Sequence, residues 1–197
     1  APGLMVRTGL GDSMELRISP PSAIFIDGET FMGDVGLGIK YSTEIGEGFQ
    51  VGVVPAFSAP VKGEDRDAGG AGATIAALWA LDLGGGLGVG GNVGTDISGI
   101  AAPGLTEYEG DADLTHFVTL SGGYGLSDQM SLFAEGYAIL GDDTELYADA
   151  GLLYLLTPNV QIDVSAGLPL SQTDAAWVGV GVVLLVGGSD GDAGAEG

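Results

Sequence analysis

Apolar side chains alternate with small, polar or charged ones through eleven short segments of the chain. Residues 33–41 show the pattern best, with Val35, Leu37, Ile39 and Tyr41 on one side and Asp34, Gly36, Gly38 and Lys40 on the other. A period of two residues is that of a β-strand. The pattern therefore predicts an all-β fold. Few of the residues are large enough to build a hydrophobic core between two sheets, which favours a barrel. We expect an antiparallel up-and-down transmembrane β-barrel with an apolar outside and a polar, glycine-lined lumen.

The predicted strands are joined by connections of two lengths. Tight turns are expected at 11–12, 46–47, 83–84, 127–128 and 158–159, mostly longer loops at 20–30, 58–70, 96–111 and 169–175, and a short link at 141–143. In bacterial outer-membrane barrels the short turns are periplasmic and the long loops extracellular, so the last strand would end in the periplasm. The strands are expected at 3–10, 13–19, 31–42, 48–57, 71–82, 85–95, 112–125, 130–140, 144–156, 160–168 and 176–186.

Eleven is an unusual strand number for such a barrel. Bacterial single-chain barrels usually have an even number of strands and two periplasmic termini, whereas this alternation starts at the extracellular end. We therefore expect a twelfth strand before Ala1 in the native protein; an eleven-stranded closure and a sheet completed by another chain are the alternatives. Residues 1–186 would form one barrel domain, and the Gly/Asp-rich residues 187–197 a disordered tail.

Outward-facing aromatic residues give an independent test, because such side chains gather at the membrane interfaces of a barrel. Strand parity turns five of them outward near the short-turn end: Tyr41, Phe49, Trp79, Tyr124 and Tyr154. They predict an interfacial girdle in contact with outer-membrane lipids. Phe31 and Phe57 also have outward parity and would begin the girdle at the other end.

Composition narrows the possible functions. The chain has 38 glycines among 197 residues without a triplet period, which excludes collagen, and it has no cysteine, which excludes disulfides and thiolate metal sites. Its net charge of −22 makes a nucleic-acid partner very unfavourable. Acidic residues cluster in the expected loops and in the tail: Glu64, Asp65, Asp67, Glu107, Glu109, Asp111, Asp142, Asp143, Asp190, Asp192 and Glu196. Solvated loops are the simpler interpretation; divalent cations bridging these carboxylates to anionic lipids or glycans are the alternative.

The inward-facing side chains carry the candidate chemistry. Arg7, Arg17 and Lys40 fall on the first three strands, and a three-residue loop after the first strand would place Arg7 opposite Arg17. Acidic side chains gather on later strands, at Asp113, Glu135, Glu145, Asp149 and Asp163, while Glu15 and Asp34 lie near the basic ones. The neutral polar lining is Gln50, Asn92, Thr115, Thr119, Ser121, Gln161 and Ser165. We hypothesise a field between a basic and an acidic wall of an open pore; ion pairs that plug a narrow barrel are the alternative.

Two features invite an enzymatic or cofactor interpretation. Gly86-x-Gly88-x-x-Gly91 matches the dinucleotide fingerprint, but no helix is expected to follow the glycines, so they are interpreted as small lumen-facing residues. The single histidine, His116, is expected on the outward face. Outer-membrane phospholipases carry a His-x-Ser pair on that face, whereas Val118 stands two residues after His116 here. We therefore expect no catalytic residue, no metal and no cofactor.

Several strand and turn phrases resemble a known family. They are VRTGLGDSMELRIS (6–19), GDVGLGIKY (33–41), LFAEGY (132–137) and LTPNVQIDVSAGLPLSQTDAAWVGVGV (156–182). In this order they are similar to the outer-membrane transporter family labelled for the MetA pathway of phenol degradation. The resemblance implies passage of small solutes, including aromatic or hydrophobic ones, and it implies a strand before the Arg7 phrase. It carries over no binding residues.

A porin-like channel or transporter in the outer membrane is thus the expected function. A non-conducting barrel that serves structure or interaction, with other copies or accessory proteins as partners, is the alternative. A barrel lipase or protease would need a nucleophile and base together near the membrane edge, and one poorly placed histidine argues against it.

Overall fold

The computed structural model describes residues 5–21, 23–26, 29–61, 70–101, 110–171 and 176–184. Within them, eleven strands form one antiparallel sheet in the order β1-β2-β5-β6-β7-β8-β9-β10-β11-β12-β13, so each of these strands pairs with the next one along the chain. Their bounds are β1 Val6–Gly9, β2 Met14–Ser19, β5 Val35–Glu44, β6 Phe49–Ala59, β7 Ala71–Gly84, β8 Leu87–Ile100, β9 Asp113–Gly125, β10 Met130–Leu140, β11 Thr144–Thr157, β12 Val160–Pro169 and β13 Trp177–Leu184. The predicted all-β, antiparallel, up-and-down fold is confirmed.

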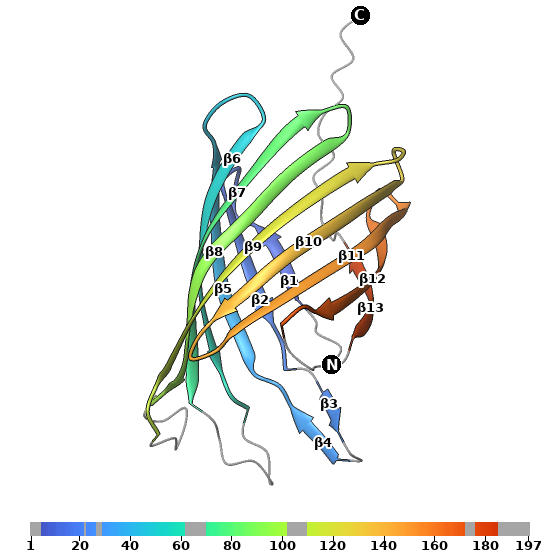
Figure 1. The fold of residues 1–197 in the computed structure, drawn as a ribbon. Coiled ribbons are helices and arrows are strands. Elements are labelled where there is room, and N and C mark those ends of the chain that lie inside the picture. Colours follow the sequence, from blue (N-terminus) through green and yellow to red (C-terminus); the bar gives the residue numbers. More distant parts are fainter. Residues whose placement is uncertain are drawn as a thin grey trace, which may run out of the picture.

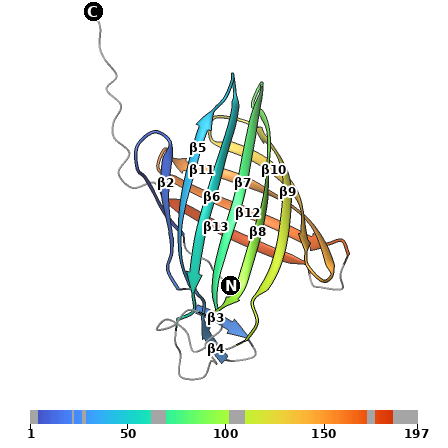
Figure 2. The ribbon, with the colours of Figure 1, turned by 90° about the vertical axis from the view of Figure 1, so that its left-hand side faces the viewer.

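The sheet curls on itself so that β5 to β8 and β10 to β13 form two facing walls (Figures 1 and 2). The strands from β5 to β12 have 10 to 14 residues, and about 9 to 11 tilted residues suffice to cross a membrane. Among the described residues, β1 and β13 each pair with one neighbour and are the sheet's edges. The expected twelfth strand stays a prediction.

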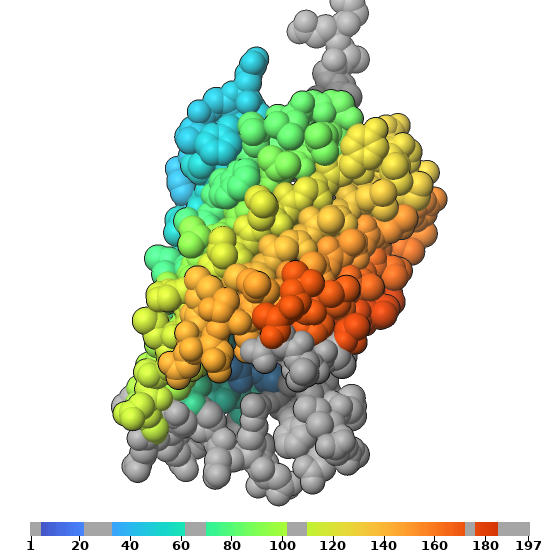
Figure 3. Space-filling view, in the orientation of Figure 1, coloured from blue at the N-terminus to red at the C-terminus, as the bar shows by residue number. Residues whose placement is uncertain are grey.

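The two faces of the sheet differ in exposure with a period of two. Along β9 the even-numbered Leu114, His116, Val118, Leu120 and Tyr124 are exposed, and the odd-numbered residues from Thr115 to Gly125 are half-buried. No large side chain in the described residues is fully buried, and the apolar side chains instead cover the outside. Figure 3 shows the outer surface over β9 to β12 as one continuous face. A barrel in lipid has this inverted distribution, because its apolar side chains face the membrane rather than a core.

The turn between β7 and β8 shows how the sequence sets a tight connection. Gly84, Gly85 and Gly86 have φ values of +78°, +63° and +82°. Residues with a Cβ pay roughly 1–2 kcal/mol each in this left-handed region, which explains why three glycines stand in succession. The glycine motif that resembles a dinucleotide fingerprint therefore begins in this turn and continues into β8. Its last glycine, Gly91, pairs with the outward-facing Trp79, so the prediction that it faces the lumen is wrong.

Two predicted strand boundaries are wrong. The strand expected at 85–95 continues as β8 to Ile100, so residues 96–100 of the expected loop belong to the sheet. The strand expected at 31–42 begins at Val35, because Glu29–Met32 forms β4 and pairs with β3 (Ala23–Ile26) in a separate two-stranded sheet. Figures 1 and 2 show this hairpin beyond the end of the barrel wall. Phe31 thus lies on the hairpin and not on a barrel strand as predicted. No helix in the described part of the chain is long and apolar enough to cross a membrane.

Candidate functional site in the lumen

A basic cluster lies on β1, β2 and β5. Arg7 and Arg17 are direct cross-strand partners, as the sequence predicted from a three-residue loop. Glu15 supplies their counter-charge, since its two oxygens accept from Arg7 Nη2 at 2.8 Å and from Arg17 Nε at 2.7 Å. Lys40 pairs in register with Glu15 on the other side of β2. One carboxylate therefore bridges two guanidinium groups that would otherwise repel each other.

An acidic and aromatic cluster lies on β10 and β11. Glu135 and Asp149 are direct cross-strand partners, and the next inward pair along the strands is Tyr137 and Tyr147. The tyrosine rings are stacked, with centroids 4.8 Å apart and planes 13° from parallel. Tyr147 also donates its hydroxyl to Glu145 at 2.7 Å. Opposed side chains in such pairs have Cβ atoms about 4.5–5.5 Å apart, so negative charge is concentrated on this wall.

The other two acidic residues predicted for this wall lie apart from the cluster. Asp113 is the first residue of β9, and its carboxylate accepts from the Leu114 backbone N–H at 2.9 Å. Asp163 lies on β12, where its carboxylate occupies the space beside Gly181 on β13. The structure thus brings Glu135, Glu145 and Asp149 together and leaves Asp113 and Asp163 separate.

Neutral polar residues line the wall between the two clusters. Asn92 donates to Thr119 at 3.0 Å, and Ser121 donates to the Gly90 carbonyl at 3.4 Å. Thr115 pairs in register with Asp96, which accepts a hydrogen bond from Thr74. The remaining members of the predicted lining, Gln50, Gln161 and Ser165, lie on β6 and β12 with the inward parity of their strands.

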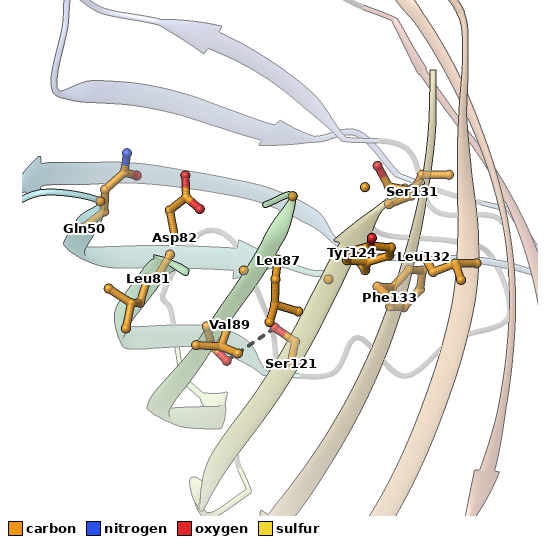
Figure 4. A pocket seen from close by; sticks show the side chains of 18 residues that line it. Gln50, Leu81, Asp82, Leu87, Val89, Ser121, Tyr124, Ser131, Leu132 and Phe133 are labelled. Atoms are coloured by element: carbon orange, nitrogen blue, oxygen red, sulfur yellow. Dashed lines mark hydrogen bonds between the residues drawn. The ribbon is translucent and has the colours of Figure 1, made fainter. Parts of the chain in front are cut away.

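A cavity of about 590 Å³ lies between the strands at the short-turn end of the lumen. Gln50, Asp82, Ser121 and Ser131 contribute polar groups to its lining, together with the ring of Phe133 (Figure 4). Several glycines complete the lining. The cavity therefore places a few polar groups and an aromatic ring around one open space.

Sequence reasoning missed a set of inward aromatic residues. Besides the tyrosine pair, Phe117, Phe133 and Trp177 have the inward parity of β9, β10 and β13. Strand alternation was sufficient to find them. Phe117, for example, has an odd-numbered position on the strand, as do the inward-facing Thr115 and Thr119. The lumen is consequently aromatic as well as charged on the β9 to β13 side.

The five residues predicted for the aromatic girdle all lie toward the short-turn ends of their strands: Tyr41, Phe49, Trp79, Tyr124 and Tyr154. Tyr41 and Tyr124 are exposed, and the other three are half-buried on the same outer face. Their contact with a membrane interface stays a prediction. On this face His116 forms a 2.8 Å hydrogen bond with Thr95, its cross-strand partner.

The predicted acidic loops are only partly within the described residues. Asp111, Asp142 and Asp143 are described, and the positions 64, 65, 67, 107 and 109 and the tail 187–197 lie outside. The described residues contain no group of three or more potential metal ligands. Cation bridging at the loops stays a prediction.

The sequence matches, over residues 5–183, the family described as "Putative MetA-pathway of phenol degradation". The chain belongs to this family. Among solved structures it is similar to the NanC porin, with a TM-score of 0.66 and 11% identity over 93% of this chain and 92% of that chain. No curated protein of similar sequence was found. The family match and the structural likeness together identify the fold as a porin-like β-barrel.

Proposed function

We propose that this barrel passes small solutes, aromatic or hydrophobic ones among them, across the outer membrane between a basic and an acidic wall. The family description supports this class of solute. Short turns and the end of the last strand would be periplasmic, and the long loops extracellular. Outer-membrane lipids would surround the outer face, and divalent cations at the acidic loops and oligomeric or accessory protein partners are further expectations.

The observation that best supports the proposal is which charged side chains of the lumen form ion pairs with one another. Two ion pairs are seen among the described lumen side chains, and both join Glu15 to an arginine of its own wall. In sheet order β10 lies six strands from β2, and β11 six strands from β5, so the acidic cluster lies about half a barrel away. Ion pairs that plug the lumen would have to join these two sides. The observed pairs favour an open passage with opposed charges.

Conductance in planar lipid bilayers tests this function. The wild-type protein should form a conducting channel. In a salt gradient, Glu135→Gln combined with Asp149→Asn should shift the reversal potential toward anion preference. Arg17→Gln should shift the reversal potential toward cation preference. Thr119→Ser is the control, because it changes a neutral lining residue. A folded wild-type barrel that carries no current and copurifies with protein partners would instead support the structural alternative.

A further inference from the structure

Three large aromatic side chains of the lumen stand directly opposite glycines on the neighbouring strand. Phe117 pairs in register with Gly94, Phe133 with Gly151, and Trp177 with Gly167. The same pairing occurs on the outer face between Trp79 and Gly91. The pattern thus recurs at four places on two faces of the sheet.

In each lumen pair the ring occupies the space that a Cβ on the glycine would need. A Cβ at Gly167 would lie 2.5 Å from Trp177 Cε2 and Nε1 and 2.6 Å from its Cζ2. Cβ atoms at Gly94 and Gly151 would overlap the rings of Phe117 and Phe133 in the same way. The rings therefore lie against the wall, over the glycines, instead of extending across the lumen.

The Tyr137–Tyr147 pair shows how two inward aromatic rings pack when neither stands opposite a glycine. Tyr137 stands opposite Tyr147, and neither ring can lie over the other's backbone, so the two stack side by side. An inward side chain has the wall on one side and the lumen on the other. If a methyl group takes the wall position, the ring has to move toward the lumen axis.

Resting on the proposed channel function, we propose that Gly94, Gly151 and Gly167 are positioning residues that set the bore of the pore by seating Phe117, Phe133 and Trp177 against the wall. Gly→Ala at these positions narrows the passage by displacing a ring. The glycines are thus required for the width of the lumen beyond any role in strand packing.

Gly167 offers the cleanest test, because the three atoms nearest to the place that a Cβ would take there all belong to the Trp177 side chain. At Gly94 and Gly151 a Cβ would also approach the carbonyl oxygens of Ile75 and Val164, at 2.7 and 2.6 Å, which would strain the sheet itself. Gly167→Ala should lower single-channel conductance, roughly two-fold, because the displaced ring reduces the pore diameter. Gly167→Ala with Trp177→Ala should restore it.

Gly88→Ala is the matched control, since Gly88 also faces the lumen and its nearest neighbour, the Leu81 carbonyl oxygen, would be 3.7 Å away. Its conductance should equal that of the wild type. Equal conductance of Gly167→Ala and Gly88→Ala, or a loss that persists when Trp177 is removed, would overturn the inference.

Trp177 fluorescence provides a readout that does not need ion flow. The chain has two tryptophans, so Trp79→Phe leaves Trp177 as the reporter. In that background Gly167→Ala should increase quenching by acrylamide and Gly88→Ala should not; unchanged quenching in both would refute the ring displacement. A wild-type barrel that fails to conduct while Gly167→Ala still raises quenching would contradict the channel function and leave the seating of the ring intact.

Discussion

Placing an arginine at Leu120 would test the lipid-facing side of the barrel most directly. Leu120 lies in the middle of β9, is 61% exposed and stands between Gly91 and Gly136 on the neighbouring strands. Arg at the midplane of a β-barrel costs about 2–4 kcal/mol of folding free energy. The folded-to-unfolded ratio should therefore fall roughly 30- to 700-fold, since about 1.4 kcal/mol is a factor of ten.

Leu114→Arg is the matched control on the same strand and face. Leu114 is 51% exposed and lies six residues from Leu120, about 20 Å along the strand at 3.4 Å per residue. For a strand tilted by about 45° this separation is about 14 Å in depth, roughly half of a 30 Å hydrocarbon core. The control should therefore lie near the interface and cost only about 0–1 kcal/mol.

Ser121→Arg tests the opposite face at the same depth. Ser121 faces the lumen and pairs in register with Glu135, so an arginine there gains water and an opposed carboxylate. We expect its cost to stay under about 1 kcal/mol. Urea titrations of the barrel in phospholipid vesicles, followed by tryptophan fluorescence and gel mobility, measure all three variants. Equal losses at Leu120 and Ser121 would refute the assignment of faces.

Two further substitutions test the local geometry of the barrel. Glu15→Gln removes the shared partner of Arg7 and Arg17 and should lower the free energy of unfolding by about 1 kcal/mol, a modest value because these side chains are partly exposed. In a urea titration 1 M salt should reduce this loss. A loss of stability that does not depend on salt would contradict the electrostatic cause. Gly85→Ala should cost roughly 1–2 kcal/mol in the same titration, because Gly85 has a φ of +63° and open space around it. Equal stability of Gly85→Ala and Gly88→Ala would refute backbone strain as the reason.

Alternation was sufficient to predict most of the fold because each barrel strand has one face toward lipid and one toward the lumen. The β3–β4 hairpin was not predicted, because apolar and polar residues alternate only weakly over 23–26 and 29–32. Part of the second of these segments, residues 31–32, was therefore assigned to the strand that follows it. The opposition of Arg7 and Arg17 could be predicted because it depends on one three-residue loop. The counter-ion role of Glu15 could not, because parity fixes a face and leaves rotamers open.

The glycine–aromatic pairs needed the structure for a different reason. Parity alone places Phe133 and Gly151 in the lumen, but their contact depends on the register of β10 against β11, which a shift of one residue would destroy. From the sequence alone an inward-facing glycine would be expected to leave space in the lumen. In the structure the space beside Gly94, Gly151 and Gly167 is filled by aromatic rings. An abundance of inward glycine is therefore a poor measure of how open a barrel is.

The two charged clusters, taken together, suggest how such a lumen would discriminate among solutes. In the basic cluster the three basic side chains and Glu15 leave a net charge of +2, and in the acidic cluster Glu135, Glu145 and Asp149 give −3. In the proposed open passage these charges would be opposed, so an ion of either sign would meet attraction from one wall and repulsion from the other. A neutral dipolar solute is instead oriented between them. The arrangement favours selection by dipole and shape over selection by net charge, and neutralising one wall should convert it into an ordinary ion-selective pore.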